Sequence, residues 1–166
     1  MRINDIEEFF NENVTKKTIT ALSLDEKNNI SLITSENVSF DFDSLDKPIN
    51  TKDKIKSSDT LFFKDGKIIF VEFKRGAKIP EQQFRLKAIE SILIFYNYIF
   101  ANNFTENLYL PNDLFQIYFV YNKENISATA LPYFSNIKRK LGIQYKHLIS
   151  EYHIIDKDEF ILQFEN

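Results

Sequence analysis

Two apolar runs joined by Asp65 and Gly66 constrain the fold of this chain more than any other feature. The runs cover residues 60–64 and 67–75 and are rich in Ile, Phe and Val, which favour β-strands. An Asp-Gly dipeptide between two such runs favours a type I′ turn, because both central residues of that turn need a positive φ. A turn of two residues also decides which residues of the two strands face each other. The sequence therefore predicts a β-hairpin whose register is known in advance.

The register of this hairpin gathers charged residues at one end. Thr60 pairs with Val71, so the next pair is Asp59 with Glu72, and directly opposed residues project from the same face with Cβ atoms about 5 Å apart. Lys74 lies two residues beyond Glu72 and emerges on that face as well. The second strand is apolar on both faces until these charges begin, as in a strand that is covered on both sides. We therefore expect Asp59, Glu72 and Lys74 to lie together at the buried end of a central strand.

The rest of the chain predicts a mixture of helices and strands. Apolar residues recur at helical spacing over residues 5–13, and they cover most of the circumference of residues 80–102. The other predicted elements are a meander of short strands at residues 17–24, 30–34 and 38–42, a connection at 43–58, a buried strand at 114–121, a helix at 132–141 stopped by Gly142, and closing strands at 153–155 and 160–164. This order predicts an α/β fold with a mixed central sheet, in one domain spanning residues 1–166.

Composition narrows the possible classes of protein. Hydrophobic residues make up 43% of the 166 residues and the net charge is −3, so the composition of a disordered chain is excluded. The absence of Cys excludes disulfides and thiolate chemistry. The sequence shows no signal-peptide pattern and no apolar run long enough to span a bilayer, so we expect a cytoplasmic protein with no membrane partner. A phosphate-binding loop, a serine-hydrolase elbow and a dinucleotide-binding fingerprint are also missing.

Two carboxylates at the predicted separation need a compensating charge. At about 5 Å they repel by roughly 3 kcal/mol at an effective dielectric constant near 20. A raised pKa on one carboxyl, the ammonium of Lys74, or a divalent cation between Asp59 and Glu72 could each supply the compensation. Hard oxygen ligands without a thiol favour Mg²⁺ or Mn²⁺ over zinc. Such an ion, held by two carboxylates, suits the hydrolysis of a phosphodiester bond.

These residues resemble the motif of a nuclease superfamily. Ser58-Asp59, the hairpin, and then Glu72-Phe73-Lys74, followed by a long helix and another strand, resemble the PD-(D/E)XK nuclease superfamily over residues 5–122. Ser58 stands where the motif has Pro. The resemblance implies a restriction-endonuclease-like core (helix, antiparallel meander and hairpin, helix, strand) with small C-terminal α/β additions. It also implies that Asp59 and Glu72 are metal ligands, that the carbonyl of Phe73 is a further ligand, and that Lys74 is the catalytic lysine.

The resemblance and the local charge suggest further functional residues. Many members of the superfamily add an acidic residue from the first helix, and here Glu7 is the candidate, although Glu7 could instead form a capping box with Asn4. Residues 60–89 hold seven basic and three acidic residues, so positive charge surrounds the motif. The expected nucleic-acid contacts are Arg75, Lys78, Gln83, Arg85 and Lys87. We expect nucleic acid as the partner, with DNA favoured over RNA, and a homodimer is possible because restriction-type and resolvase-type relatives commonly act as dimers.

Three alternatives stay open at this stage. A Glu-x-Lys pattern in a strand is otherwise most often a solvated edge pair. The chain could also be a binding module, without catalysis, that keeps a nuclease-like fold and engages nucleic acid or protein. A third possibility is the same site acting on RNA, as in a toxin or a defence nuclease, because nothing in the sequence reads a 2′-hydroxyl.

Overall fold

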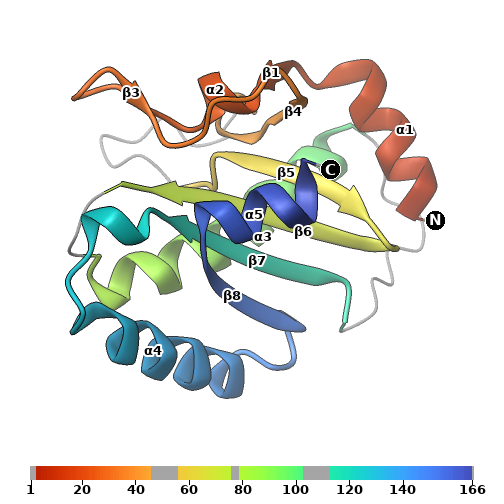
Figure 1. The fold of residues 1–166 in the computed structure, drawn as a ribbon. Coiled ribbons are helices and arrows are strands. Elements are labelled where there is room, and N and C mark those ends of the chain that lie inside the picture. Colours follow the sequence, from red (N-terminus) through yellow and green to blue (C-terminus); the bar gives the residue numbers. More distant parts are fainter. Residues whose placement is uncertain (1–2, 46–55, 76–78, 103–112, 166) are drawn as a thin grey trace.

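A computed structural model describes residues 3–45, 56–75, 79–102 and 113–165 of the chain. Its centre is a mixed sheet of six strands in the order β1-β4-β5-β6-β7-β8, with five helices packed around it (Figure 1). The elements are α1 (Ile3–Asn13), β1 (Lys16–Thr18), α2 (Ile19–Leu22), β2 (Leu24–Asp25), β3 (Ile30–Ser31), β4 (Val38–Asp41), β5 (Thr60–Lys64), β6 (Lys67–Lys74), α3 (Glu81–Ala101), β7 (Phe115–Tyr121), α4 (Ala130–Gln144), β8 (Glu151–Asp156) and α5 (Lys157–Phe164), with single 3₁₀ turns at Phe42–Ser44 and Lys123–Asn125. The predicted α/β class with a mixed central sheet is confirmed.

The predicted hairpin is present in the predicted register. Strands β5 and β6 pair antiparallel from Lys64 opposite Lys67 to Thr60 opposite Val71. The turn residues have φ values of 52° at Asp65 and 70° at Gly66, as a type I′ turn requires. Turn chemistry alone was therefore sufficient to place every residue of β6 on one face of the sheet or the other.

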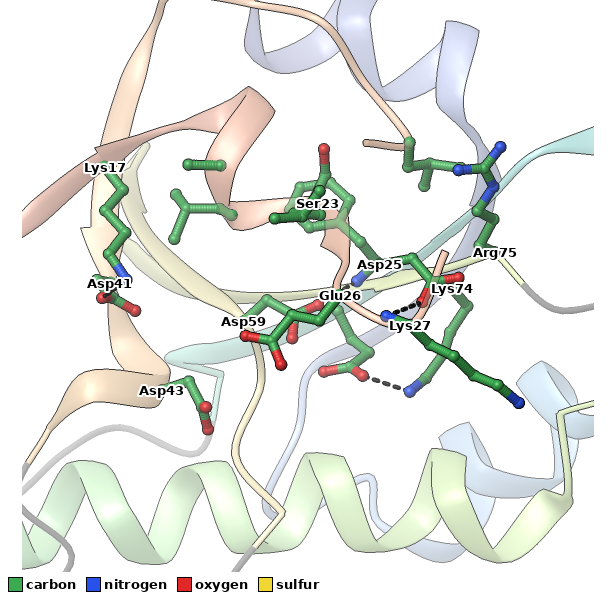
Figure 2. Close-up of a pocket in the computed structure, with 16 residues that line it drawn as sticks. Lys17, Ser23, Asp25, Glu26, Lys27, Asp41, Asp43, Asp59, Lys74 and Arg75 are labelled. Carbon is green, nitrogen blue, oxygen red and sulfur yellow. Dashed lines mark hydrogen bonds and ion pairs between the residues drawn. The ribbon is translucent and has the colours of Figure 1, made fainter. Parts of the chain in front are cut away.

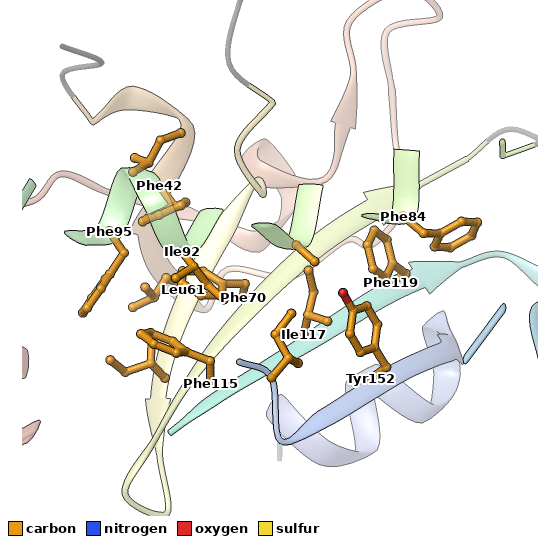
Figure 3. Packing of buried hydrophobic residues seen from close by; sticks show 14 of the residues in the cluster. Phe42, Leu61, Phe70, Phe84, Ile92, Phe95, Phe115, Ile117, Phe119 and Tyr152 are labelled. Carbon is orange, nitrogen blue, oxygen red and sulfur yellow. The ribbon is translucent and has the colours of Figure 1, made fainter. Parts of the chain in front are cut away.

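Strand β6 is the central strand of the sheet, with apolar packing on both faces. Beyond β6 the sheet continues in parallel, with β7 and then β8. One face carries Phe70 against Phe95 of α3 and Phe115 of β7 (Figure 3). Residues of α1, α3 and α4 pack on this face. The other face carries Ile69 and Val71 under α2 and α5. Because helices bury both faces, a carboxylate on β6 can reach water only at the end of the strand.

Several predicted elements at the two ends of the chain were wrong. The meander was expected to have consecutive strands, but residues 19–22 form a helix and β1 pairs directly with β4. Strands β2 and β3 form a separate two-stranded sheet. Residues 157–164 form a helix instead of a strand, because the Asp156 side chain accepts a hydrogen bond from the backbone N–H of Asp158 and caps it. Helix α4 also continues through Gly142, where an added β-carbon would meet no other group within 4 Å.

Two further observations concern the start of the chain and its long helices. Helix α1 already includes Ile3, so Asn4 lies inside the helix and is not the N-terminal cap of a capping box. Within the described ranges, no helix has the length and apolar character that crossing a membrane requires.

Candidate active site

The charged residues that were predicted together line one pocket at the end of β6. The pocket has a volume of about 520 Å³ and receives Asp59, Glu72, Lys74 and Arg75 from the hairpin. Residues of the segment from α2 to β3 and the acidic residues at the end of β4 form its other walls. Figure 2 shows Asp41 and Asp43 to one side of Asp59, with Lys74 and Arg75 to the other. The site lies where the β5–β6 ladder ends and the sheet opens to solvent.

Glu72 is the buried centre of this site. Its exposed fraction is 1%, because it follows the apolar positions Ile68 and Phe70 on the face that α3 covers. One carboxylate oxygen, Oε1, lies 2.5 Å from the Nζ atom of Lys74. The other, Oε2, lies 2.7 Å from the Nζ atom of Lys87, which comes from α3. Two ammonium groups therefore compensate a single buried carboxylate.

Asp59 lies just beyond the last ladder pair, and backbone groups of β6 hold it. Its backbone N–H donates to the carbonyl of Val71 at 3.0 Å, and its Oδ2 atom accepts a hydrogen bond from the N–H of Phe73 at 2.7 Å. Burial and the adjacent charge of Glu72 raise the pKa of Asp59 well above its usual value, although Lys87, the N–H of Phe73 and Lys74 oppose the shift. Asp59 is therefore inclined to hold a proton.

Four acidic residues of this pocket, Asp25, Glu26, Asp41 and Asp43, were missed in the sequence. Asp41 is 5% exposed and its Oδ2 atom lies 2.6 Å from the Nζ atom of Lys17. Asp43 accepts a hydrogen bond from the hydroxyl of Ser57. Asp41 pairs with Thr60 between strands β4 and β5, and Asp59 directly precedes Thr60 in the sequence. The signal that could have found Asp41 is the one that found Glu72: a carboxylate at the end of a short apolar strand.

Lys87 lies against the buried carboxylate of the site. It was expected to contact nucleic acid, but its ammonium points inward, to Glu72 and to the carbonyl of Ser57 at 2.6 Å. Burial by itself lowers the pKa of Lys87, but the charges of Glu72 and Asp59 and a hydrogen bond to Glu72 raise it above its usual value. Lys87 is therefore fully charged at neutral pH and belongs to the site itself.

The segment that carries Asp59 is fastened to the same helix. Ser91, one turn after Lys87, accepts a hydrogen bond from the N–H of Ser58 at 2.9 Å, and the two hydroxyl groups lie 2.9 Å apart. Ser57, Ser58 and Ser91 are all fully buried. The small Ser58 side chain at the position before Asp59 thus has a packing role of its own, which joins the strand to α3.

Of the remaining predicted site residues, Arg75 lines the pocket, whereas Glu7, Gln83 and Arg85 do not. Glu7 is half-buried on α1 and is not among the residues that line it. Gln83 and Arg85 lie in the first turns of α3, also outside the lining. Lys78 falls outside the described residues. Arg75 does line the pocket, and its Nη1 atom is buried without a hydrogen-bond partner in the described part of the chain.

The donor set of the site fits a divalent cation only in part. Asp59 and Glu72 offer hard carboxylate oxygens, and the repulsion between them is of the kind that a cation relieves. Across the described ranges, however, no three side chains of His, Asp or Glu come together as a ready metal site. For Phe73, the group in contact with Asp59 is the backbone N–H, while its predicted role as a carbonyl ligand stays a prediction.

Comparison with known proteins gives no relative for this chain. No protein-family model, no curated protein and no solved structure matches it.

Proposed function

We propose that this protein is a metal-dependent endonuclease that hydrolyses phosphodiester bonds, with DNA as the favoured substrate. One observation carries the proposal: Asp59, Glu72 and Lys74 line the same pocket at the end of the central strand. The order of a helix, an antiparallel hairpin, a long helix and a parallel strand also resembles the core of the PD-(D/E)XK superfamily. The proposal therefore rests on residues that converge in space as well as on a sequence motif.

In this proposal the two carboxylates hold Mg²⁺ or Mn²⁺ and Lys74 acts beside them. A bound divalent ion lowers the pKa of a water ligand and neutralises charge that develops on the phosphate. The Lys74 side chain is 20% exposed while Glu72 fixes its ammonium at 2.5 Å, so the ammonium stands at the boundary between the buried carboxylate and the pocket. From there Lys74 can orient an attacking water or stabilise the charge of the transition state.

Positive charge at the pocket supports an anionic substrate. Lys17, Lys27, Lys74 and Arg75 all line it, from three separate parts of the sequence. Lysine and arginine side chains around a site attract the phosphate backbone of nucleic acids. A phosphodiester that enters the pocket would therefore lie within reach of these cations, next to the carboxylates that share the pocket.

The test is a cleavage assay with matched variants. Labelled duplex DNA, branched DNA and RNA are incubated with Mg²⁺, Mn²⁺ or EDTA, and wild type is compared with Glu72→Ala, Lys74→Ala and the surface control Lys140→Ala. We expect metal-dependent cleavage, strongest on DNA, that both site variants lose and the control keeps. Cleavage that survives in Glu72→Ala, or that EDTA leaves unchanged, would contradict the proposal.

A second candidate function is a binding module without catalysis. The observation that favours it is that both oxygens of Glu72 already have lysine partners. A site whose charge is compensated in this way could stabilise the fold without any metal. Under this alternative, wild type binds nucleic acid in a gel-shift assay but cleaves none of the three substrates, and Glu72→Ala leaves binding unchanged.

A further inference from the structure

The ammonium of Lys87 contacts Glu72 and is attracted by two further acidic residues of the site. It is 2.7 Å from Oε2 of Glu72, and the charges of Asp59 and Asp43 also act on it. The side chain is only 16% exposed, so water screens these attractions weakly. An enclosed position in contact with one carboxylate and within the field of two others would also attract a divalent cation.

The charge of Lys87 acts on Asp59 more strongly than the charge of Lys74 does. Of the two ammonium groups, Lys87 opposes the raised pKa of Asp59 more strongly than Lys74 does. Lys74 approaches Glu72 from the end of the same strand, whereas Lys87 reaches Glu72 from α3. Lys87 therefore interacts with both carboxylates that were proposed to share a metal ion.

The position of this ammonium is fixed by the structure around it. It donates to the carbonyl of Ser57, and the backbone carbonyl of Lys87 accepts a hydrogen bond from the hydroxyl of Ser91 at 2.6 Å. Ser91 in turn holds the backbone of Ser58, next to Asp59. The segment before β5 and the first half of α3 thus position the Lys87 side chain together.

We propose that Lys87 is a positioning residue that serves as a built-in cation: it holds Glu72 in place beside Asp59, and a divalent ion must compete with it for Oε2 of Glu72. This inference rests on the proposed function, since it concerns the same metal site. A permanent charge at this position keeps the two carboxylates ordered before metal binds. It also lowers the affinity of the site for the metal, because like charges repel.

The test measures metal affinity directly, without any cleavage assay. Binding of Mn²⁺ at pH 8 is followed by titration calorimetry and by the electron-spin signal of free Mn²⁺, for wild type, Lys87→Met, Lys74→Met and the surface control Lys140→Met. We expect the dissociation constant to fall about tenfold in Lys87→Met, since a unit of positive charge leaves the site. Lys74→Met should change it less, and the control should leave it unchanged. If Lys87 had only a structural role, Lys87→Met would bind Mn²⁺ more weakly than wild type.

The outcomes separate this inference from the proposed function. If wild type binds Mn²⁺ and a folded Lys87→Met binds it no tighter, Lys87 does not compete with the metal and the inference is wrong. If none of the proteins binds Mn²⁺, the proposed metal-dependent function fails and the inference fails with it. Folding is checked by circular dichroism, and if Lys87→Met is unfolded, Lys87→Gln decides the question, because its amide can still donate to the carbonyl of Ser57.

Discussion

Replacing Glu72 by Gln should destabilise the protein far more than a change of one surface charge. Gln keeps the shape of the side chain but leaves the ammonium groups of Lys74 and Lys87 without their carboxylate. Removal of one partner from a buried ion pair costs about 3–5 kcal/mol. The two lysine side chains are 20% and 16% exposed, and Asp59 gains from the loss of a like charge, so the cost falls at or below the lower end of this range. We expect a loss of roughly 2–3 kcal/mol in the free energy of unfolding.

Urea unfolding at pH 7.5, followed by circular dichroism, measures this loss. The matched control is Glu81→Gln, which breaks a Glu–Lys contact of the same 2.5 Å length with Lys140, where the two side chains are 40% and 52% exposed. An exposed pair of this kind contributes only about 0–1 kcal/mol. If Glu72→Gln and Glu81→Gln cost the same, Glu72 is not the buried partner of two lysines, and the site as described here is incorrect.

Three further variants test other parts of the structure. Folding raises the pKa of Asp59 above 3.8, so the stability that this carboxyl contributes is present at low pH and is lost as pH rises through the folded-state pKa. Asp59→Asn should therefore raise the melting temperature at pH 8 and not at pH 4. Ser91→Ala should cost about 1–3 kcal/mol in urea unfolding, because the buried N–H of Ser58 loses its acceptor, and no loss would mean that this link is unimportant. Tyr152→Phe should be neutral or stabilise by up to about 1 kcal/mol, since the buried hydroxyl has no hydrogen-bond partner in the described chain, and a clear loss would reveal one.

The hairpin could be predicted from the sequence because local chemistry determines it. The two turn residues need positive φ values, and Asp-Gly supplies them at low cost. Once the turn is fixed, the two-residue period of a strand assigns each side chain to a face. The apolar residues on both faces of residues 67–73 then indicated a central strand. Each step used only neighbouring residues, and each agrees with the structure.

The role of Lys87 could not be predicted in the same way. Helix α3 has apolar residues on most of its circumference, so the pattern does not show which side faces the sheet. The rotation of the helix is decided by tertiary packing, such as Phe84 against Phe119 and Phe95 against Phe70. A lysine on a nearly uniform helix was therefore assigned to the surface, when the packing turns it toward Glu72.

The errors at the ends of the chain have two different causes. Helix α2 has only four residues, which is too short for a helical period to be visible, and it separates two segments that were predicted as one strand. For α5 the signal was present but overlooked: Asp156 with Glu159 three residues later, directly before an apolar run, has the form of a helix start. The first error needed tertiary information, whereas the second needed only a closer reading of the capping residues.

The charges around Asp59 bear on how the proposed metal site would work. Six acidic side chains line the pocket, those of Asp25, Glu26, Asp41, Asp43, Asp59 and Glu72. Lys17 forms an ion pair with Asp41, and Lys74 and Lys87 form ion pairs with Glu72. The carboxylate of Asp59 accepts a hydrogen bond from the backbone N–H of Phe73, and burial together with the charge of Glu72 raises the pKa of Asp59. A proton on Asp59 is thus the first means of compensating the remaining charge. A divalent cation is the second, and because the two exclude each other, metal binding at this site should release a proton.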